Sequence, residues 1–328
     1  MQAVVVSNEP SQRTAYFIKA GEYAGVNVRF ITYRELEQRL PAYRNMLIKL
    51  EPPLYHQAGW KACHALCMEY IEWLRRIARL ESDPTARFLN RPEAIVHALD
   101  KAESKRRLAG LRTTPLLSPA VEGFHSLVGL LSEQHCSAAF IKPRFGSGAA
   151  GILALRYHKK KGRFAACTTL AQNGALAYNT RRINRLTDTR QIAGLVNTVA
   201  ETGALAERWI PKDSLCGETY DLRVVCQFDR IACLAVRCSK GAITNLHLNN
   251  KALPPACLRL PAGVMDEIKD LCIRATRLSA LQYAGIDVLI EKDAKRPYII
   301  EVNGQGDHIR RDLYDGNTIY KNQLMQAL

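Results

Sequence analysis

A glycine-rich loop constrains the fold of this chain more than any other stretch of its sequence. Its notable residues are Lys142, Gly146, Ser147, Gly148 and Gly151. The glycines match G-x-G-x-x-G, which in dinucleotide-binding proteins opens a helix and is followed by an acid about 20 residues on. Here residues 152–157 alternate like a strand, and no Asp or Glu occurs between Gly151 and Asp188. The loop is therefore predicted to be the tip of a β-hairpin.

A phosphate-binding flap is one interpretation of this hairpin. No Gly-Lys-Ser/Thr follows the glycines, so the Walker A pattern is not met. Lys142 precedes the loop, whereas in protein kinases the glycine loop precedes its lysine. Backbone N–H groups at the tip could cradle phosphates while the Lys142 ammonium binds their oxygens. An ordinary flexible hairpin is the alternative.

Carboxylates gather near the C-terminal end of the chain. Residues 285–303 are predicted to form two strands joined by a polar turn at 292–296. Because alternate residues of a strand face the same way, Glu301 and Asn303 should point together, and pairing of the strands should bring Asp287 alongside. Two carboxylates and an amide oxygen suit Mg²⁺, which also takes phosphate oxygens as ligands. Surface carboxylates without a metal are the alternative.

A second hairpin is predicted over residues 218–237, with its turn near 228–230. Asp221 and Arg223 share one face of the first strand, and Arg237 lies near the end of the second. The forked guanidinium of Arg223 suits a phosphate. A cross-strand ion pair with Asp221 is the alternative, and the two roles are compatible.

The first part of the chain alternates between strand-like and helix-like segments. Residues 3–6 and 26–31 are strand-like, and a helical pattern that ends near Ala24 lies between them. This alternation predicts a small α/β domain with a parallel sheet. Further helices are predicted over residues 60–80 and from about 93 to 109.

Charge and hydropathy limit the partners. The chain has 46 lysines and arginines against 31 acids, a formal charge of +15, which predicts an anionic ligand. No recognised nucleic-acid module accompanies them, and clusters such as 105–107, 159–161 and 310–311 are interpreted as solvated surface. No apolar run reaches the ~18 residues that span a bilayer, and no secretion signal is apparent. Ten irregularly spaced cysteines suggest reduced thiols, so a cytoplasmic protein without membrane contact is expected.

Short motifs follow one another in a set order. They are Asp100-Lys101, Ile141-Lys142 with the glycine loop, Glu207-Arg-Trp-Ile-Pro211, Tyr220-Asp-Leu-Arg223, Asn245-Leu-His247, Ala284-Gly-Ile-Asp287 and Ile300-Glu-Val-Asn303. In this order, residues 95–305 resemble the ATP-grasp superfamily. The chain is most similar to the branch containing ribosomal-protein S6 glutamate ligase, lysine-biosynthesis ligase and glutathione synthetase-like proteins. It also resembles an uncharacterised bacterial ATP-grasp group.

The resemblance implies an α/β plus α+β fold in which two lobes hold ATP. A small parallel α/β (pre-ATP-grasp) domain would cover residues 1–95. The first ATP-grasp lobe, with the glycine loop, would cover residues 96–205, and the second, with the metal site, residues 206–328.

The resemblance also implies roles for individual residues. The phosphates of ATP would be bound by Lys101, Lys142, Gly146, Ser147 and Gly148, and the adenine by Glu207, Arg208, Trp209 and Ile210. Two Mg²⁺ ions, with Mn²⁺ as an alternative, would be bound by Asp287, Glu301 and Asn303. Arg223, Arg237 and Asn245 would lie near the transferred phosphoryl group.

The activity implied is ligation of a small-molecule or peptide carboxylate to an amine, or to a thiol, through an acyl phosphate. The alternatives are a phosphotransferase on the same fold and a non-catalytic protein that binds nucleotides or nucleic acid. The chain departs from the branch pattern at residues 248–250 and 304–308, which face the acceptor in the family. His308, Arg310 and Arg311 are suggested to hold an acidic substrate, with solvated charge as the alternative.

Overall fold

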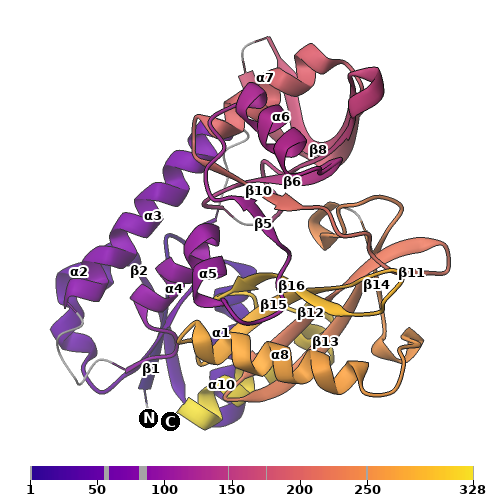
Figure 1. Cartoon of the computed structure of the whole chain (residues 1–328). Coiled ribbons are helices and arrows are strands. Elements are labelled where there is room, and N and C mark those ends of the chain that lie inside the picture. Colours follow the sequence, from indigo (N-terminus) through magenta and orange to yellow (C-terminus); the bar gives the residue numbers. More distant parts are fainter. Residues whose placement is uncertain are drawn as a thin grey trace.

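Three β-sheets organise the protein, as the computed structural model in Figure 1 shows. The structure describes residues 2–54, 59–80, 87–146, 148–174, 176–248 and 250–327. In these residues, no helix is long and apolar enough to cross a membrane. None of the ten cysteines, all of which are described, forms a disulfide.

The N-terminal sheet is parallel, with strand order β2-β1-β3-β4, which confirms the predicted small α/β unit. Its elements are β1 (Gln2–Ser7), α1 (Gln12–Ala24), β2 (Asn27–Thr32), α2 (Tyr33–Arg39), β3 (Leu47–Leu50), α3 (Trp60–Leu80) and β4 (Arg87–Phe88). Helix α1 begins where the Ser11 hydroxyl accepts the Thr14 N–H, and it ends at Gly25, whose φ of +65° favours glycine. Strands β3 and β4 are short and were not predicted.

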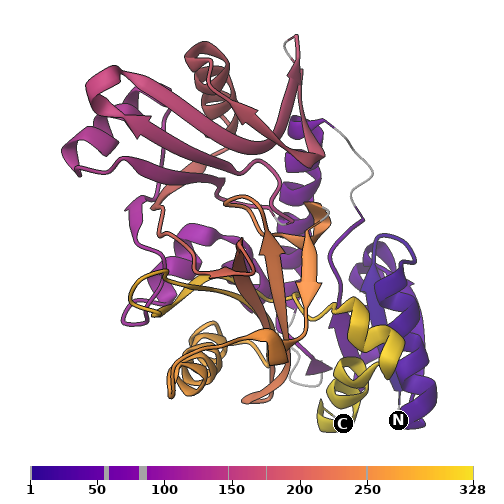
Figure 2. The same ribbon diagram turned by 90° about the vertical axis from the view of Figure 1, so that its right-hand side faces the viewer.

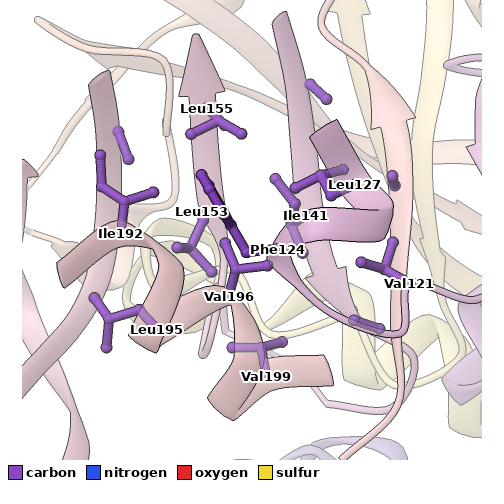
Figure 3. Packing of buried hydrophobic residues seen from close by; sticks show 14 of the residues in the cluster. Val121, Phe124, Leu127, Ile141, Leu153, Leu155, Ile192, Leu195, Val196 and Val199 are labelled. Carbon is purple, nitrogen blue, oxygen red and sulfur yellow. The ribbon is translucent and has the colours of Figure 1, made fainter. Parts of the chain in front are cut away.

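The middle sheet has the order β5-β10-β6-β7-β8-β9. Its elements are β5 (Leu116–Ser118), α6 (Phe124–Glu133), β6 (Ala138–Pro143), β7 (Leu153–His158), β8 (Arg163–Asn173), β9 (Leu176–Leu186), α7 (Thr189–Ala200) and β10 (Ala204–Arg208). Figure 3 shows Phe124 and Leu127 of α6, with Ile192 and Val196 of α7, packed against Leu153. Both helices cover the same face of the sheet.

The C-terminal sheet has the order β14-β13-β12-β15-β16, with β11 paired to β12. Its elements are β11 (Ser214–Leu215), β12 (Glu218–Gln227), β13 (Arg230–Ser239), β14 (Lys251–Leu253), α8 (Val264–Leu278), β15 (Tyr283–Ile290) and β16 (Pro297–Asn303). The two predicted hairpins are therefore β12–β13 and β15–β16, and Val302, between Glu301 and Asn303, is fully buried.

The prediction of a single helix from about 93 to 109 is wrong. The structure has two helices there, α4 (Pro92–Leu99) and α5 (Lys101–Arg107). The break is at Asp100, whose carboxylate accepts the N–H groups of Ala102 and Glu103 at 3.1 and 3.2 Å and so caps α5. This cap makes Lys101 the first residue of α5.

The last two helices return to the N-terminal sheet, as Figure 2 shows. They are α9 (Arg310–Asp315) and α10 (Thr318–Ala327). Tyr320 and Leu324 of α10 share a core with Ala3 and Phe17, and Tyr283 of β15 belongs to the same core. The N-terminal and C-terminal sheets are thus joined by a common core, while the residue limits of the three domains stay a prediction.

Candidate active site

The predicted glycine hairpin joins β6 to β7, which pair antiparallel. Gly146 and Gly148 have φ values of +133° and +69°. A Cβ added to either would meet no atom within 4 Å, and both residues line a large cavity. Glycine therefore gives this loop its backbone conformation and keeps its peptide groups open to the cavity. Ser147 lies outside the described residues.

Lys142 is buried in an ion-pair cluster at the end of β6. Its ammonium donates to Glu207 Oε2 at 2.6 Å, and the Thr114 hydroxyl donates to the same oxygen at 2.6 Å. Lys105 Nζ lies 3.5 Å from Glu207 Oε1 and donates to the Thr114 carbonyl at 2.7 Å. Although burial alone would raise it, the pKa of Glu207 is held low by Lys105 and Lys142. Glu207 is thus a buried anion that fixes two lysines.

Lys105 corrects one interpretation of the sequence. Residues 105–107 were interpreted as solvated surface, but the side chain of Lys105 is only 8% exposed. Burial lowers its pKa to about 8, while Glu207 acts in the opposite direction. No sequence pattern predicts the burial of this lysine, because it lies among basic residues on a short helix.

The segment predicted to bind adenine follows Glu207. Arg208 ends β10 and is exposed, and Ile210 is buried. The Trp209 N–H donates to the Ala138 carbonyl at 3.1 Å, and its ring lies 5.1 Å from that of Phe140. Arg156 lies over the Trp209 ring at 4.7 Å. The segment is therefore attached to β6, the strand that carries Lys142.

The predicted metal ligands come together on neighbouring strands. Asp287 of β15 pairs directly with Glu301 of β16, and Glu301 and Asn303 both line the large cavity. Arg223 Nε lies 2.9 Å from Asp287 Oδ1, and Lys101 Nζ lies 3.3 Å from Glu301 Oε1. Burial raises the pKa of Asp287, although Arg223 and Arg237 oppose this.

These oxygens fit a divalent cation. Asp287 Oδ1 is buried and forms an ion pair with Arg223 but accepts no well-aligned hydrogen bond from any described residue. Carboxylate and amide oxygens are the donor set of Mg²⁺. Among the described residues, no group of three His, Cys, Asp or Glu side chains is placed to hold a metal ion. Asp287, Glu301 and Asn303 would therefore need further oxygens from a ligand or from water.

A buried network supports Asp287 from behind. Arg237 bridges two carboxylates, with Nε 2.7 Å from Asp221 Oδ1 and a second nitrogen 3.2 Å from Asp287 Oδ2. Lys212 Nζ lies 3.0 Å from Asp221 Oδ2, and the Thr244 hydroxyl bonds to that oxygen as well. Burial would raise the pKa of Asp221, but Arg237 and Lys212 outweigh it and lower the pKa. Asp221 thus pairs with Arg237, and Arg223 is left to pair with Asp287.

Two glycines make room for Arg223. Its Nη1 lies 3.3 Å from the Gly285 carbonyl. A Cβ on Gly285 would come within 2.6 Å of this nitrogen, and one on Gly306 within 2.5 Å. The guanidinium is therefore packed between two backbone segments that only glycine leaves open.

The large cavity has a volume of about 1190 Å³. Of the predicted site residues, its lining contains Gly146, Gly148, Arg223, Arg237, Asn245, Glu301 and Asn303, and it also contains the suggested substrate-binding residues His308, Arg310 and Arg311. The other predicted site residues that the structure describes are not in its lining: Lys101, Lys142, Glu207, Arg208, Trp209, Ile210 and Asp287. Lys101 connects the two sides, since its ammonium also donates to the Gly146 carbonyl at 2.7 Å.

The sequence also gave no signal for a buried ion network under one wall of the cavity. Lys49 Nζ lies 2.6 Å from Asp307 Oδ2 and 3.3 Å from Glu51 Oε1, and all three side chains are fully buried. Arg13 pairs with Glu51, lies 2.7 Å from Asp307 and donates to the Gln305 carbonyl at 2.8 Å. The N-terminal domain thereby holds the segment that follows Asn303.

Comparison with known proteins agrees with this architecture. Residues 216–324 match the model of the RimK-like ATP-grasp domain. No match was found among curated proteins. The fold is similar to that of D-cycloserine synthetase DcsG, at 12% identity and a TM-score of 0.62 over 99% of both chains.

Two further structures have the same fold. Macrocyclase MdnC, solved with precursor peptide MdnA from Microcystis aeruginosa MRC, is 11% identical, with a TM-score of 0.61 over 99% of both chains. D-alanine–D-alanine ligase from Bacillus anthracis, solved with ATP, is 12% identical. Its TM-score is 0.56 over 100% of this chain and 95% of that one. Residues 216–324 thus match a RimK-like ATP-grasp domain, and the motif order and the three-sheet architecture of the chain agree with that match.

Proposed function

We propose that the chain is an ATP- and Mg²⁺-dependent ligase that joins a carboxylate to an amine, or to a thiol, through an acyl phosphate. The observation that carries the proposal is a set of charged groups at one cavity and on the strands beside it. Asp287 pairs with Glu301 across β15 and β16, and Lys101 contacts both Glu301 and the Gly146 carbonyl. The Lys142–Glu207 ion pair lies at the end of β6, next to the glycine hairpin. Such a set can neutralise a polyphosphate along its length.

In the proposed reaction, a carboxylate oxygen attacks the γ-phosphorus of ATP and ADP leaves. The amine nitrogen then attacks the acyl carbon, loses a proton and releases phosphate. Phosphoryl transfer depends mainly on positioning and charge neutralisation, which are assigned to Lys101, Lys142 and Arg223. Mg²⁺, when bound by Asp287, Glu301 and Asn303, would withdraw charge from the phosphate oxygens.

The names of the similar structures support this type of reaction, since they include a synthetase, a macrocyclase and a ligase. The test is mass spectrometry of reactions that contain ATP, Mg²⁺ and a panel of acid–amine pairs, small molecules and peptides included. ADP, free phosphate and a new amide are expected. If a phosphorylated product persists and no amide forms, the protein is a phosphotransferase and not a ligase. If no acid–amine pair leads to ADP formation, the proposal is refuted.

The low pKa of Lys105 predicts how nucleotide binding depends on pH. Near pH 8 the ammonium is partly deprotonated, because its pKa is about 8. Phosphate charge should favour the protonated form, so binding of Mg·ADP should take up a proton at pH 8 and weaken as the pH rises above 8. Calorimetry in two buffers of different ionisation enthalpy measures this uptake. Lys105→Gln should abolish this proton uptake. If the affinity of the unmodified protein for Mg·ADP does not change between pH 7 and pH 9, the prediction is wrong.

Gly306→Ala should displace Arg223 and the adjacent backbone of β15 by steric clash. Gly306 does not have a positive φ, but its Cβ would come within 2.5 Å of Arg223 Nη1 and 2.7 Å of the Gly285 Cα. We expect kcat to fall at least ~10-fold, about 1.4 kcal/mol of transition-state stabilisation. Gly304→Ala is the matched control, because its closest contact would be 3.3 Å from Leu281. Equal losses in the two variants would show that the Arg223 position is not the cause.

A further inference from the structure

Positive charge is concentrated on the lobe that carries the glycine hairpin. Residues 134–187 contain ten lysines and arginines and no aspartate or glutamate. Nine of these cations are exposed, and one of the nine, Arg144, pairs with Asp100. We call the other eight the basic surface: Arg156, Lys159, Lys160, Lys161, Arg163, Arg181, Arg182 and Arg185. This segment therefore supplies much of the net charge of +15.

The basic surface is not neutralised from within the protein. None of its eight cations forms an ion pair with any described residue. Some exposed cations elsewhere do pair with acids: Arg76 lies 2.7 Å from Glu37, and Lys269 lies 2.9 Å from Asp266. Unpaired like charges repel one another and give the fold no stability, so their clustering favours an external anion.

The basic surface lies beside the proposed catalytic cavity. Along β7, Leu153 and Leu155 face the core under α6 and α7, so Arg156 lies on the opposite face, where its side chain is exposed. Arg156 and Arg163 also line a second cavity of about 520 Å³. At one end Arg156 stacks on Trp209, and at the other Arg181 lines the large cavity. Charge thus extends from the outer edge of the lobe to the site.

We propose that the basic surface binds an acidic peptide segment of the substrate. This inference rests on the proposed function, because the proposed ligase needs a carboxylate substrate. A peptide rich in Asp and Glu supplies that carboxylate as well as the negative charge that would bind the basic surface. The large cavity, about 1190 Å³, is above the usual range of about 300–1,000 Å³ for small-ligand pockets. Such a peptide would lie along β7–β9 and place one carboxylate at the inner end, near Arg181.

The test measures binding by fluorescence anisotropy, with the full chain and a labelled, alternating Glu-Gly dodecapeptide. A Gln-Gly dodecapeptide and a single-stranded dodecanucleotide are the comparison probes. We expect the Glu-Gly peptide to bind most tightly and its affinity to fall as NaCl rises, since exposed charge pairs are screened. Lys159→Gln with Lys160→Gln and Lys161→Gln should weaken binding ~10-fold or more, as should Arg181→Gln with Arg182→Gln.

The matched control removes three exposed cations from the N-terminal domain, Lys19→Gln with Arg34→Gln and Arg39→Gln. It should weaken binding less than ~2-fold. Equal weakening in the control, equal binding of the Gln-Gly peptide, or tighter binding of the oligonucleotide would each overturn the proposal. Because no ATP is present, the result is independent of ligation. If the peptide binds but no amide forms, the proposed ligase activity is refuted while the proposed role of the basic surface in peptide binding is retained.

Discussion

Changing Asp287 to asparagine is expected to lower ADP formation at least ~10³-fold, about 4 kcal/mol of transition-state stabilisation, while the protein still folds. The loss follows if Asp287 and Glu301 bind the metal, because a neutral amide cannot balance the charge of the cation. The fold should survive because asparagine has nearly the same size, and Arg237 keeps its 2.7 Å contact with Asp221. Burial also raises the pKa of Asp287, so its ionised form is not favoured by the fold.

The measurement is ADP release with the substrate found by mass spectrometry, together with the thermal midpoint. Glu301→Gln should behave in the same way. Asp293→Asn is the matched control, since it makes the same change in the exposed turn of the same hairpin, and it should retain full activity. ATP consumption at the rate of the unmodified protein by Asp287→Asn would eliminate the proposed metal site.

Lys49→Met should be the most destabilising single change outside the cavity. The ammonium of Lys49 donates to Asp307 at 2.6 Å, to Tyr283 at 3.0 Å and to Gln323 at 2.9 Å. Without it, Arg13 is the one cation among the described residues that still pairs with the buried carboxylates of Asp307 and Glu51. Removing one partner of a buried ion pair costs about 3–5 kcal/mol, which should appear in the free energy of unfolding by urea.

Two further variants make this prediction specific. Lys19→Met removes an exposed lysine of α1 and should change stability by less than about 0.5 kcal/mol. Lys49→Met combined with Asp307→Leu removes opposite charges together and should recover part of the loss. A loss below about 1 kcal/mol for Lys49→Met alone would show that the network does not stabilise the fold.

Local patterns predicted the strands that carry the site. Alternation along 285–303 is enough to place Glu301 and Asn303 on one face, and the short turn brings Asp287 opposite Glu301. The glycine hairpin was predicted for the same reason, because residues 152–157 have the period of a strand. The break at Asp100 was missed, since the residues on both sides of it favour helix and only the capping bonds reveal the end.

Long-range ion pairs could not be predicted from one sequence. Lys49 and Asp307 are 258 positions apart, and neither stands in a motif. Lys105 is hidden in a basic triplet, and its burial depends on Glu207 and Thr114 from other parts of the chain. The roles of individual residues in catalysis stay predictions, which the variants above can test.

Product release should depend on movement of the middle sheet, because the N-terminal and C-terminal sheets share a core and do not move independently. Tyr283 shares a core with Ala3 and Phe17, and the Arg13–Asp307 pair crosses the same boundary. The core of the middle sheet is separate, and all its buried members except Trp60 lie between Leu117 and Ala206. We therefore expect the middle sheet and its helices to move as one rigid body relative to the other two sheets. A peptide bound to the basic surface would move toward the other two sheets as the cavity closes and away from them as the cavity opens.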